Sequence, residues 1–294
     1  MEIKFTKMQG CGNDYIYING AETAIEQAKK PELVKKLSNR NFGIGGDGVI
    51  FINPVPEEEE KRLGQPVDFE MEMYNADGSR AEMCGNGIRC VAKYVYDKGL
   101  TDQTKISIVS CGKVKQLELT VKDGKTESVK VNMGAPILKA DDIPVISKQE
   151  EVINEEIDVE GKTYKMTCVS MGNPHAVVFL GEEENLENFA IEKTGPYFEH
   201  HVRFPKRVNT EFVKVVDRHT VQMRVWERGT GETLACGTGA CAVAAACILN
   251  GLTAEKVTVK LLGGELDILW DGKENPIYMT GPAEFVFEGE IRIE

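Results

Sequence analysis

The chain has 294 residues, of which 41% are hydrophobic and 28% are charged, and its formal net charge is −12. These values are typical of a globular protein of about two domains and exclude a disordered chain. A strongly acidic chain without a basic run is also a poor partner for nucleic acid or for an anionic membrane.

Strand patterns dominate the chain. Alternating or β-branched runs predict strands, in chain order, at 14–18, 49–52, 67–73, 114–121, 129–133, 176–180, 212–216, 221–226, 257–262 and 266–270. Helical spacing predicts fewer helices, at 31–37, 88–95, 186–191 and 240–249, the last of them buried because it is apolar on every side. The acidic stretches 54–61 and 148–160 indicate solvated loops.

The apolar run 240–249 is too short to cross a bilayer, and the N-terminus lacks the apolar core of a signal peptide. We therefore expect a cytoplasmic protein without a membrane partner. The eight cysteines are too few for a disulfide scaffold and form no Cys-x-x-Cys pair, and there are only four histidines. Free thiols and no metal site are expected.

An internal repeat is the most informative feature of the sequence. Residues 74–101 align without a gap to residues 226–253, at an offset of 152 and with eight identities. The alignment places Cys84-Gly85-Asn86-Gly87 over Cys236-Gly237-Thr238-Gly239. A weaker similarity, at an offset of 160, relates residues 12–17 to residues 172–177. Two similarities in the same order indicate two homologous halves, with a boundary near 131–136.

Each repeated cysteine precedes glycines that open a predicted helix. The unpaired N–H groups at a helix start favour a thiolate and can bind an anion. Two buried structural cysteines would be the simpler interpretation, but the duplication argues against it, because equivalent thiols on equivalent halves can face one cleft. One thiolate could then remove a proton from a carbon while the opposite thiol delivers another to the far face. The residues alone therefore suggest a cofactor-independent amino-acid racemase or epimerase, with helix-start amides on the α-carboxylate.

Seven short motifs occur in order along the chain. They are Gly10-Cys11-Gly12-Asn13-Asp14-Tyr15, Asn75-Ala76-Asp77-Gly78-Ser79, Cys84-Gly85-Asn86-Gly87-Ile88-Arg89-Cys90, Gly172-Asn173-Pro174-His175, Arg207-Val208-Asn209, Trp226-Glu227-Arg228-Gly229 and Ala235-Cys236-Gly237-Thr238-Gly239. Together they resemble the diaminopimelate epimerase family over essentially the whole chain. That resemblance implies interconversion of LL-diaminopimelate and meso-diaminopimelate, for lysine and peptidoglycan precursors, without a cofactor.

The resemblance also implies a fold. It is an α+β fold of two pseudo-symmetric domains, each a β-barrel-like sheet around a central helix. We expect the N-terminal domain at 1–132, completed by about 282–294, and the C-terminal domain at 133–281. The expected partner is a small-molecule substrate and not nucleic acid, and the assembly that we expect is a homodimer.

Site roles follow from the resemblance residue by residue. Cys84 and Cys236 are the expected acid–base thiols, and His175 and Glu227 are expected to adjust their pKa values. The expected substrate-binding residues are Asn13, Asn75, Gly85, Asn86, Asn173, Asn209, Glu227, Arg228, Gly237 and Thr238. One position departs from the family, since many relatives carry Gln where this chain has Gly48.

Three other interpretations remain open at this point. A proline racemase of the same fold would also use paired thiols, although Glu227-Arg228 and the several Asn residues fit a second amino-acid centre better than an apolar ring. A non-catalytic amino-acid-binding protein would have no need of both thiols. A redox sensor would use Cys84 and Cys236 as a reversible disulfide, which we expect only as an inactivating side reaction.

Overall fold

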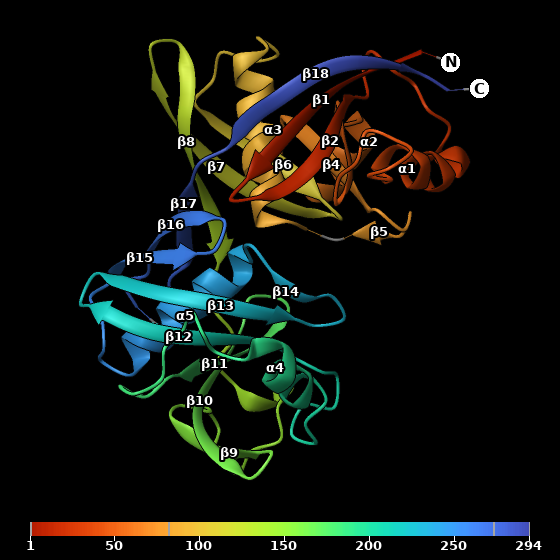
Figure 1. The fold of residues 1–294 in the computed structure, drawn as a ribbon. Coiled ribbons are helices and arrows are strands. Elements are labelled where there is room, and N and C mark those ends of the chain that lie inside the picture. Colours follow the sequence, from red (N-terminus) through yellow and green to blue (C-terminus); the bar gives the residue numbers. More distant parts are fainter. Residues whose placement is uncertain (1, 82, 273, 294) are drawn as a thin grey trace. The chain divides into compact units, whose positions relative to one another are not determined.

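The computed structural model describes residues 2–81, 83–272 and 274–293. The chain divides into two units (Figure 1). Each unit has its own hydrophobic core and its own series of paired strands. Unit 1 comprises Met1–Val131 and Gly281–Glu294, and unit 2 comprises Asn132–Thr280. Among the described residues, no helix is both long enough and apolar enough to span a membrane.

The sheet of unit 1 contains strands from both ends of the chain. Its order is β18 (Glu284–Arg292), β1 (Glu2–Gly10), β2 (Asn13–Asn19), β3 (Gly48–Asn53), β4 (Phe69–Asn75), β6 (Lys105–Ser110), β7 (Lys113–Lys122) and β8 (Lys125–Gly134). The short β5 (Arg80–Ala81) pairs with β4. The pairs β2–β3 and β4–β6 are parallel, and the other pairs in this series are antiparallel.

Unit 2 repeats this arrangement. Its order is β9 (Glu155–Val159), β10 (Lys162–Ser170), β11 (Pro174–Phe179), β12 (Asn209–Asp217), β13 (Thr220–Glu227), β15 (Lys256–Leu261), β16 (Gly264–Leu269) and β17 (Ile277–Gly281), with β14 (Gly231–Thr233) on β13. The parallel pairs are β11–β12 and β13–β15, at the same steps as in unit 1. The two halves indicated by the sequence repeat therefore share one topology.

In each unit, one central helix packs against several strands of the sheet. In unit 1, α3 (Gly85–Asp97) packs against β1, β2 and β7, and α1 (Lys30–Ser38) lies on β3 and β4 with the 3-10 turn η1 (Gln27–Lys29) before it. In unit 2, α5 (Gly237–Leu249) packs against β10, β11, β12, β13, β15 and β16. The predicted burial of the apolar helix is confirmed, because Ala240 to Cys247 are all inaccessible to solvent. The α+β fold class is confirmed as well.

Three local predictions were wrong. The acidic run predicted as a loop contains the helix α2 (Glu57–Leu63), whose first turn holds four glutamates where the positive end of the helix stabilises them. The second acidic stretch contains β9, in which Ile157 and Val159 alternate with exposed residues and are buried. The helix expected at 186–191 instead starts at its end, as α4 (Ile191–Glu199), and includes Pro196. A further 3-10 turn, η2, spans Ala140–Asp142.

Candidate functional site

Cys84 is the N-cap residue of α3. Its Sγ accepts a hydrogen bond from the backbone N–H of Gly87 at 3.3 Å, which satisfies one of the free donors at the helix start. The thiol also donates to Oδ1 of Asn13 at 3.1 Å. Nδ2 of Asn13 donates to Oδ2 of Asp47 at 2.7 Å. Because Asp47 can only accept when ionised, it turns the oxygen of the Asn13 amide toward the sulfur.

An ionic network holds Asp47 in place. Arg40 contacts both Asp14, at 2.7 Å, and Asp47, at 2.9 Å. Lys7, which is buried, also contacts Asp14 at 2.5 Å. Burial on its own would raise the pKa of the Asp14 carboxyl, but the hydrogen bonds from Arg40 and Lys7 hold that pKa below its usual range. The loop behind Asn13 is therefore anchored by charge.

The other expected site residues of unit 1 lie around the same loop. Asn75 ends β4, and its Nδ2 donates to Oγ of Ser79 at 3.0 Å. The next backbone N–H, that of Ala76, donates to the carbonyl oxygen of Asp47 at 2.9 Å. Gly85 and Asn86 are the first residues of α3 and are buried. Unit 1 thus brings Asn13 to the thiol directly and ties Asn75 to the loop that holds Asn13.

Cys236 occupies the equivalent position in unit 2, as the N-cap residue of α5. Its Sγ accepts from the backbone N–H of Gly239 at 3.4 Å and lies 3.4 Å from Oγ1 of Thr238. Burial raises the pKa of the Cys236 thiol well above its usual value, and the charges of Glu227 and Glu211 raise it further. The hydrogen bonds from Thr238 and Gly239 offset only part of this rise.

A chain of polar contacts leads away from Cys236. Nδ2 of Asn173 donates to Oγ1 of Thr238 at 3.3 Å, and Oδ1 of Asn173 lies 3.0 Å from Nε2 of His175. The other ring nitrogen of His175, Nδ1, lies 2.6 Å from Oε1 of Glu211. His175 and Glu211 are both fully buried.

Asn209, Glu227 and Arg228 form the remaining part of the expected site in unit 2. Asn209 donates from Nδ2 to the carbonyl oxygen of Pro174 at 3.2 Å and accepts from the backbone N–H of Arg228 at 2.8 Å. Glu227, at the end of β13, accepts a hydrogen bond from the hydroxyl of Thr233. The Arg228 guanidinium is exposed and uses Nη1 on the carbonyl oxygen of Lys206 at 3.0 Å. Asn209 therefore joins the Asn173 loop to the Arg228 loop.

Three structural roles escaped the sequence analysis. Glu199, which is buried, accepts from the backbone N–H of Gly229 at 2.9 Å and from Nε1 of Trp226 at 2.8 Å, and so holds the turn after Arg228. Asp47 and Glu211 were also missed. No local pattern distinguishes such acidic residues from surface carboxylates, because each has a partner that is distant in the sequence. At the family's Gln position, a Cβ on Gly48 would lie 2.0 Å from the carbonyl oxygen of Tyr74, so the chain has no room for a side chain there.

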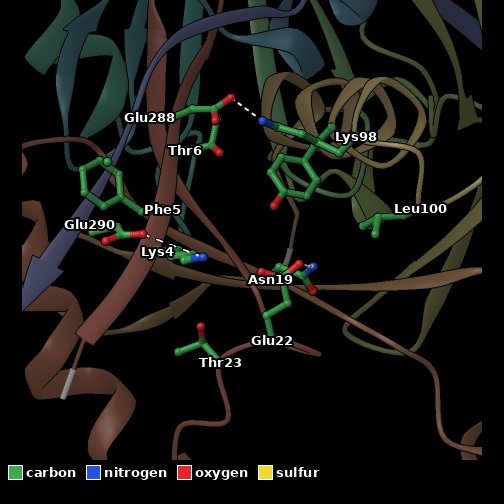
Figure 2. Close-up of a pocket in the computed structure, with 12 residues that line it drawn as sticks. Lys4, Phe5, Thr6, Asn19, Glu22, Thr23, Lys98, Leu100, Glu288 and Glu290 are labelled. Atoms are coloured by element: carbon green, nitrogen blue, oxygen red, sulfur yellow. Dashed lines mark hydrogen bonds and ion pairs between the residues drawn. The ribbon is translucent and has the colours of Figure 1, made fainter.

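Some cavities lie away from the expected site residues. One of about 470 Å³ in unit 1 is lined by Lys4, Asn19, Lys98 and Glu288, among others (Figure 2). It contains none of the expected site residues. Within the described residues, no group of three or more His, Cys, Asp or Glu side chains could hold a metal ion.

Each unit therefore presents a thiol at the start of its central helix, close to asparagine side chains and to the backbone amides of the first helical turn. Such a thiol can hold or release a proton, and the amides can bind a carboxylate. Solved structures with the same fold include a Bacillus anthracis phenazine biosynthesis protein of the PhzF family (TM-score 0.70, 16% identity, all of both chains covered). They also include a hydroxyproline epimerase from Agrobacterium vitis (TM-score 0.68, 12% identity, covering 99% of this chain and 91% of that one).

Similarity in sequence identifies the family of this chain more specifically than similarity in fold does. The family model for diaminopimelate epimerase matches residues 5–139 and 167–286. Curated diaminopimelate epimerases are 56% identical over 291 residues in Methanococcus maripaludis (99% of this chain, 100% of that protein) and 55% identical over 289 residues in Acetivibrio thermocellus (98% of each). The chain is therefore an isomerase. It belongs to the diaminopimelate epimerase family, which confirms the resemblance seen in its motifs.

Proposed function

We propose that this protein interconverts LL-diaminopimelate and meso-diaminopimelate, with Cys84 and Cys236 as the two proton-transfer groups. The observation that supports the proposal most is the duplicated geometry: in each unit the thiol caps the central helix and accepts from the N–H three residues further on. Family membership supplies the substrate, because the relatives of similar length bear that name.

The reaction needs the thiols in opposite protonation states. One thiolate takes the α-proton and becomes a thiol, while the other thiol gives its proton to the opposite face of the carbon and becomes a thiolate. No atom is gained or lost, and the product leaves the two cysteines with their states exchanged. Reversal of the reaction starts from that exchanged state, so one pair serves both directions.

The α-carboxylate takes up negative charge as the α-proton departs. We assign it to the amides at the two helix starts, those of Gly85 and Asn86 and those of Gly237 and Thr238. Preorganised N–H donors at a helix N-terminus stabilise such charge at the moment it develops.

The second amino-acid centre of the substrate needs polar partners. We assign this recognition to Asn13, Asn75, Asn173, Asn209, Glu227 and Arg228. An Arg fork matches a carboxylate, and Asn and Glu supply acceptors for an ammonium group. His175 and Glu227 belong to the same proposal, as groups that adjust the pKa of the Cys236 thiol.

The setting of the enzyme follows from the same proposal. The thiols supply the proton chemistry, so the reaction proceeds without pyridoxal phosphate or a metal ion. The protein acts in the cytoplasm, as a homodimer, within lysine and peptidoglycan precursor synthesis. The two units correspond to two epimerase domains, at 1–132 with 282–294 and at 133–281.

A substrate panel tests the proposal. The reduced protein is incubated separately with LL-diaminopimelate, L-proline and trans-4-hydroxy-L-proline, and the stereoisomers are resolved by chiral chromatography. We expect the meso isomer to form from LL-diaminopimelate and both prolines to remain unchanged. Turnover of either proline with no conversion of diaminopimelate would assign the protein to the proline racemases, and no turnover of any compound would favour a binding protein.

A further inference from the structure

A buried carboxylate, that of Glu211, lies next to the first turn of α5, the central helix of unit 2. Glu211 belongs to β12, and its side chain has no exposed surface. Its Oε1 is 2.6 Å from Nδ1 of His175. Its Oε2 has no hydrogen-bond partner among the described residues. A buried carboxylate with only one oxygen satisfied is costly, which makes a purely structural role for Glu211 a poor explanation.

Glycine at position 239 brings this carboxylate to Cys236. A Cβ on Gly239 would lie 2.7 Å from Oε1 of Glu211 and 3.3 Å from Sγ of Cys236. The same point in space is therefore close to both groups, and no side chain separates them. The other titratable groups around it are His175 from β11, Glu227 from β13 and Cys168 from β10.

Unit 1 provides an internal comparison. Ile50 pairs with Tyr17 in the parallel β2–β3 ladder, and Glu211 pairs with Val177 in the parallel β11–β12 ladder. A Cβ on Gly87 would meet Cδ1 of Ile50 at 2.8 Å, as one on Gly239 would meet the Glu211 carboxylate. The repeated fold thus places a hydrocarbon side chain under one thiol and a carboxylate under the other.

We propose that Glu211 is a positioning residue that distinguishes the two thiols, by holding its charge across Gly239 from Cys236 and by orienting His175. The contacts run without a break from Glu211 through His175, Asn173 and Thr238 to the Cys236 sulfur. The expected effect of Glu211 on turnover rests on the proposed function, whereas its expected effect on the titration of the Cys236 thiol does not.

The contacts also define where the protons lie. Oδ1 of Asn173 can only accept, so Nε2 of His175 carries a proton toward it. Two lone pairs would repel at 2.6 Å, so a second proton lies between Nδ1 of His175 and Oε1 of Glu211. The contact with Glu211 keeps Nε2–H of His175 directed at Asn173. Asn173 is held in turn with its Nδ2 toward Thr238.

The test measures the titration of each thiol without using the reaction. Alkylation of Cys236 and Cys84 by iodoacetamide is followed by peptide mass spectrometry from about pH 6 to about pH 11, a range that brackets ordinary thiol pKa values. In Glu211→Gln, the midpoint for Cys236 should move down by about one pH unit, because a nearby negative charge that opposes the thiolate is gone. The midpoint for Cys84 in the same sample should not move.

Glu155→Gln is the matched control. It removes a carboxylate from the same unit, where Glu155 pairs with Arg203 at 2.7 Å, and it should leave the Cys236 midpoint unchanged. Glu211→Asp, which keeps the charge, should restore most of the wild-type midpoint. An unshifted midpoint in Glu211→Gln, or an equal shift in Glu155→Gln, would overturn the inference.

A measurement on the unaltered protein decides the matter if Glu211→Gln does not fold. Nitrogen-15 spectra of labelled histidine should show one buried ring that carries a proton on Nε2 and donates it in a hydrogen bond. A buried ring without a proton on Nε2 would contradict the proposed orientation. Absence of turnover in the wild-type protein would instead refute the proposed function and leave this result standing.

Discussion

At the scale of single residues, the account depends on two thiols out of eight cysteines. Cys84 and Cys236 differ from the others in capping a helix, and Cys236 is joined to a polar chain that ends at a buried carboxylate. Cys90, Cys241 and Cys247 lie inside the helices and are completely buried. Burial raises the pKa of the Cys90 thiol to about 11, and its place inside α3 keeps this thiol away from the helix-start amides.

Replacing either catalytic thiol should abolish epimerisation. In Cys84→Ala and Cys236→Ala we expect losses of at least about a thousandfold in kcat, since each variant lacks one of two obligatory proton carriers. Circular dichroism should remain that of the wild type. Cys111→Ala, which removes an exposed thiol, is the control and should keep full activity. Substantial turnover by either single variant would refute the two-thiol mechanism.

The sequence reached some residues of the site and missed others, for a physical reason. Cys84 and Cys236 stand out because helix-start glycines follow each of them and because the pattern occurs twice. Glu211 has no such local signal. Its importance comes from a histidine on the neighbouring strand and from the missing side chain at Gly239, and both contacts exist only in the folded unit.

At the scale of elements, the helix starts are the most constrained part of the fold. The first turn of α5 must fit between the Cys236 thiol and the Glu211 carboxylate. A methyl group on Gly239 would lie 2.7 Å from the carboxylate oxygen, closer than a carbon–oxygen contact allows. Gly239→Ala should therefore lower the free energy of unfolding by about 2 kcal/mol, as overpacking does in a close-packed interior.

Urea unfolding measures that change. Gly181→Ala is the matched control, because its new methyl group would come no closer than 3.6 Å, to the side chain of Glu184. We expect the control to stay within about 0.5 kcal/mol of the wild type. Equal stability of the Gly239→Ala protein and the wild type would mean that the carboxylate can move away, which would weaken the account of unit 2.

A second element-level feature ties α1 to the sheet of unit 1. The Glu72 carboxylate, on β4, is buried against Lys30, with further hydrogen bonds from Gln27 at 2.7 Å and Tyr74 at 2.8 Å. Burial opposes ionisation of Glu72, but the hydrogen bonds, that with Lys30 foremost, hold its pKa below the ordinary value of 4.5. Burial raises the pKa of the Tyr74 hydroxyl, and its hydrogen bond to the Glu72 carboxylate raises that pKa further, to about 12.

This depressed pKa has a defined consequence for stability. The contribution of Glu72 is complete above about pH 5 and is lost as the pH falls through the depressed pKa of the folded state. Glu72→Gln should cost about 3 kcal/mol at neutral pH, because Lys30 stays buried without its counter-charge. The variant should also lose less stability on acidification than the wild type does.

Urea unfolding at several pH values between about 7 and about 3 would measure both effects. Glu118→Gln, at an exposed position of β7, is the control and should follow the wild-type curve. Parallel pH curves for Glu72→Gln and the wild type would contradict the assignment of the acid-sensitive step to Glu72.

The elements themselves were predictable where the pattern is strong. Apolar and polar residues alternate around β4, β7 and β13, and this period of two residues predicts strands. The run of apolar residues in α5 likewise predicts a buried helix. The helix α2 was missed because its glutamates look like a solvated loop, while their placement in the first turn of a helix is what stabilises them. The terminal strand β18 pairs with β1 from the far end of the chain, a contact that no local pattern contains.

At the scale of the whole molecule, the chain consists of two units with one topology. The gapless repeat around the two cysteines indicated this duplication, and the matching order of parallel and antiparallel pairs in both units supports it independently. The duplication also explains why both thiols occupy equivalent helix starts. The differences between the units, such as Ile50 and Glu211, then become the features that give each thiol its own role.

The central claim is that two thiols invert one carbon by exchanging protons on opposite faces. Proton NMR in deuterated buffer, with reductant present and pure LL-diaminopimelate supplied, tests it most directly. The account predicts formation of the meso isomer with deuterium at the inverted α-carbon. In the earliest turnovers the remaining LL substrate should stay unlabelled, because the base and the acid are different groups. Rapid labelling of the LL substrate before any inversion would indicate a single base, and neither labelling nor inversion by the fully reduced protein would contradict epimerisation itself.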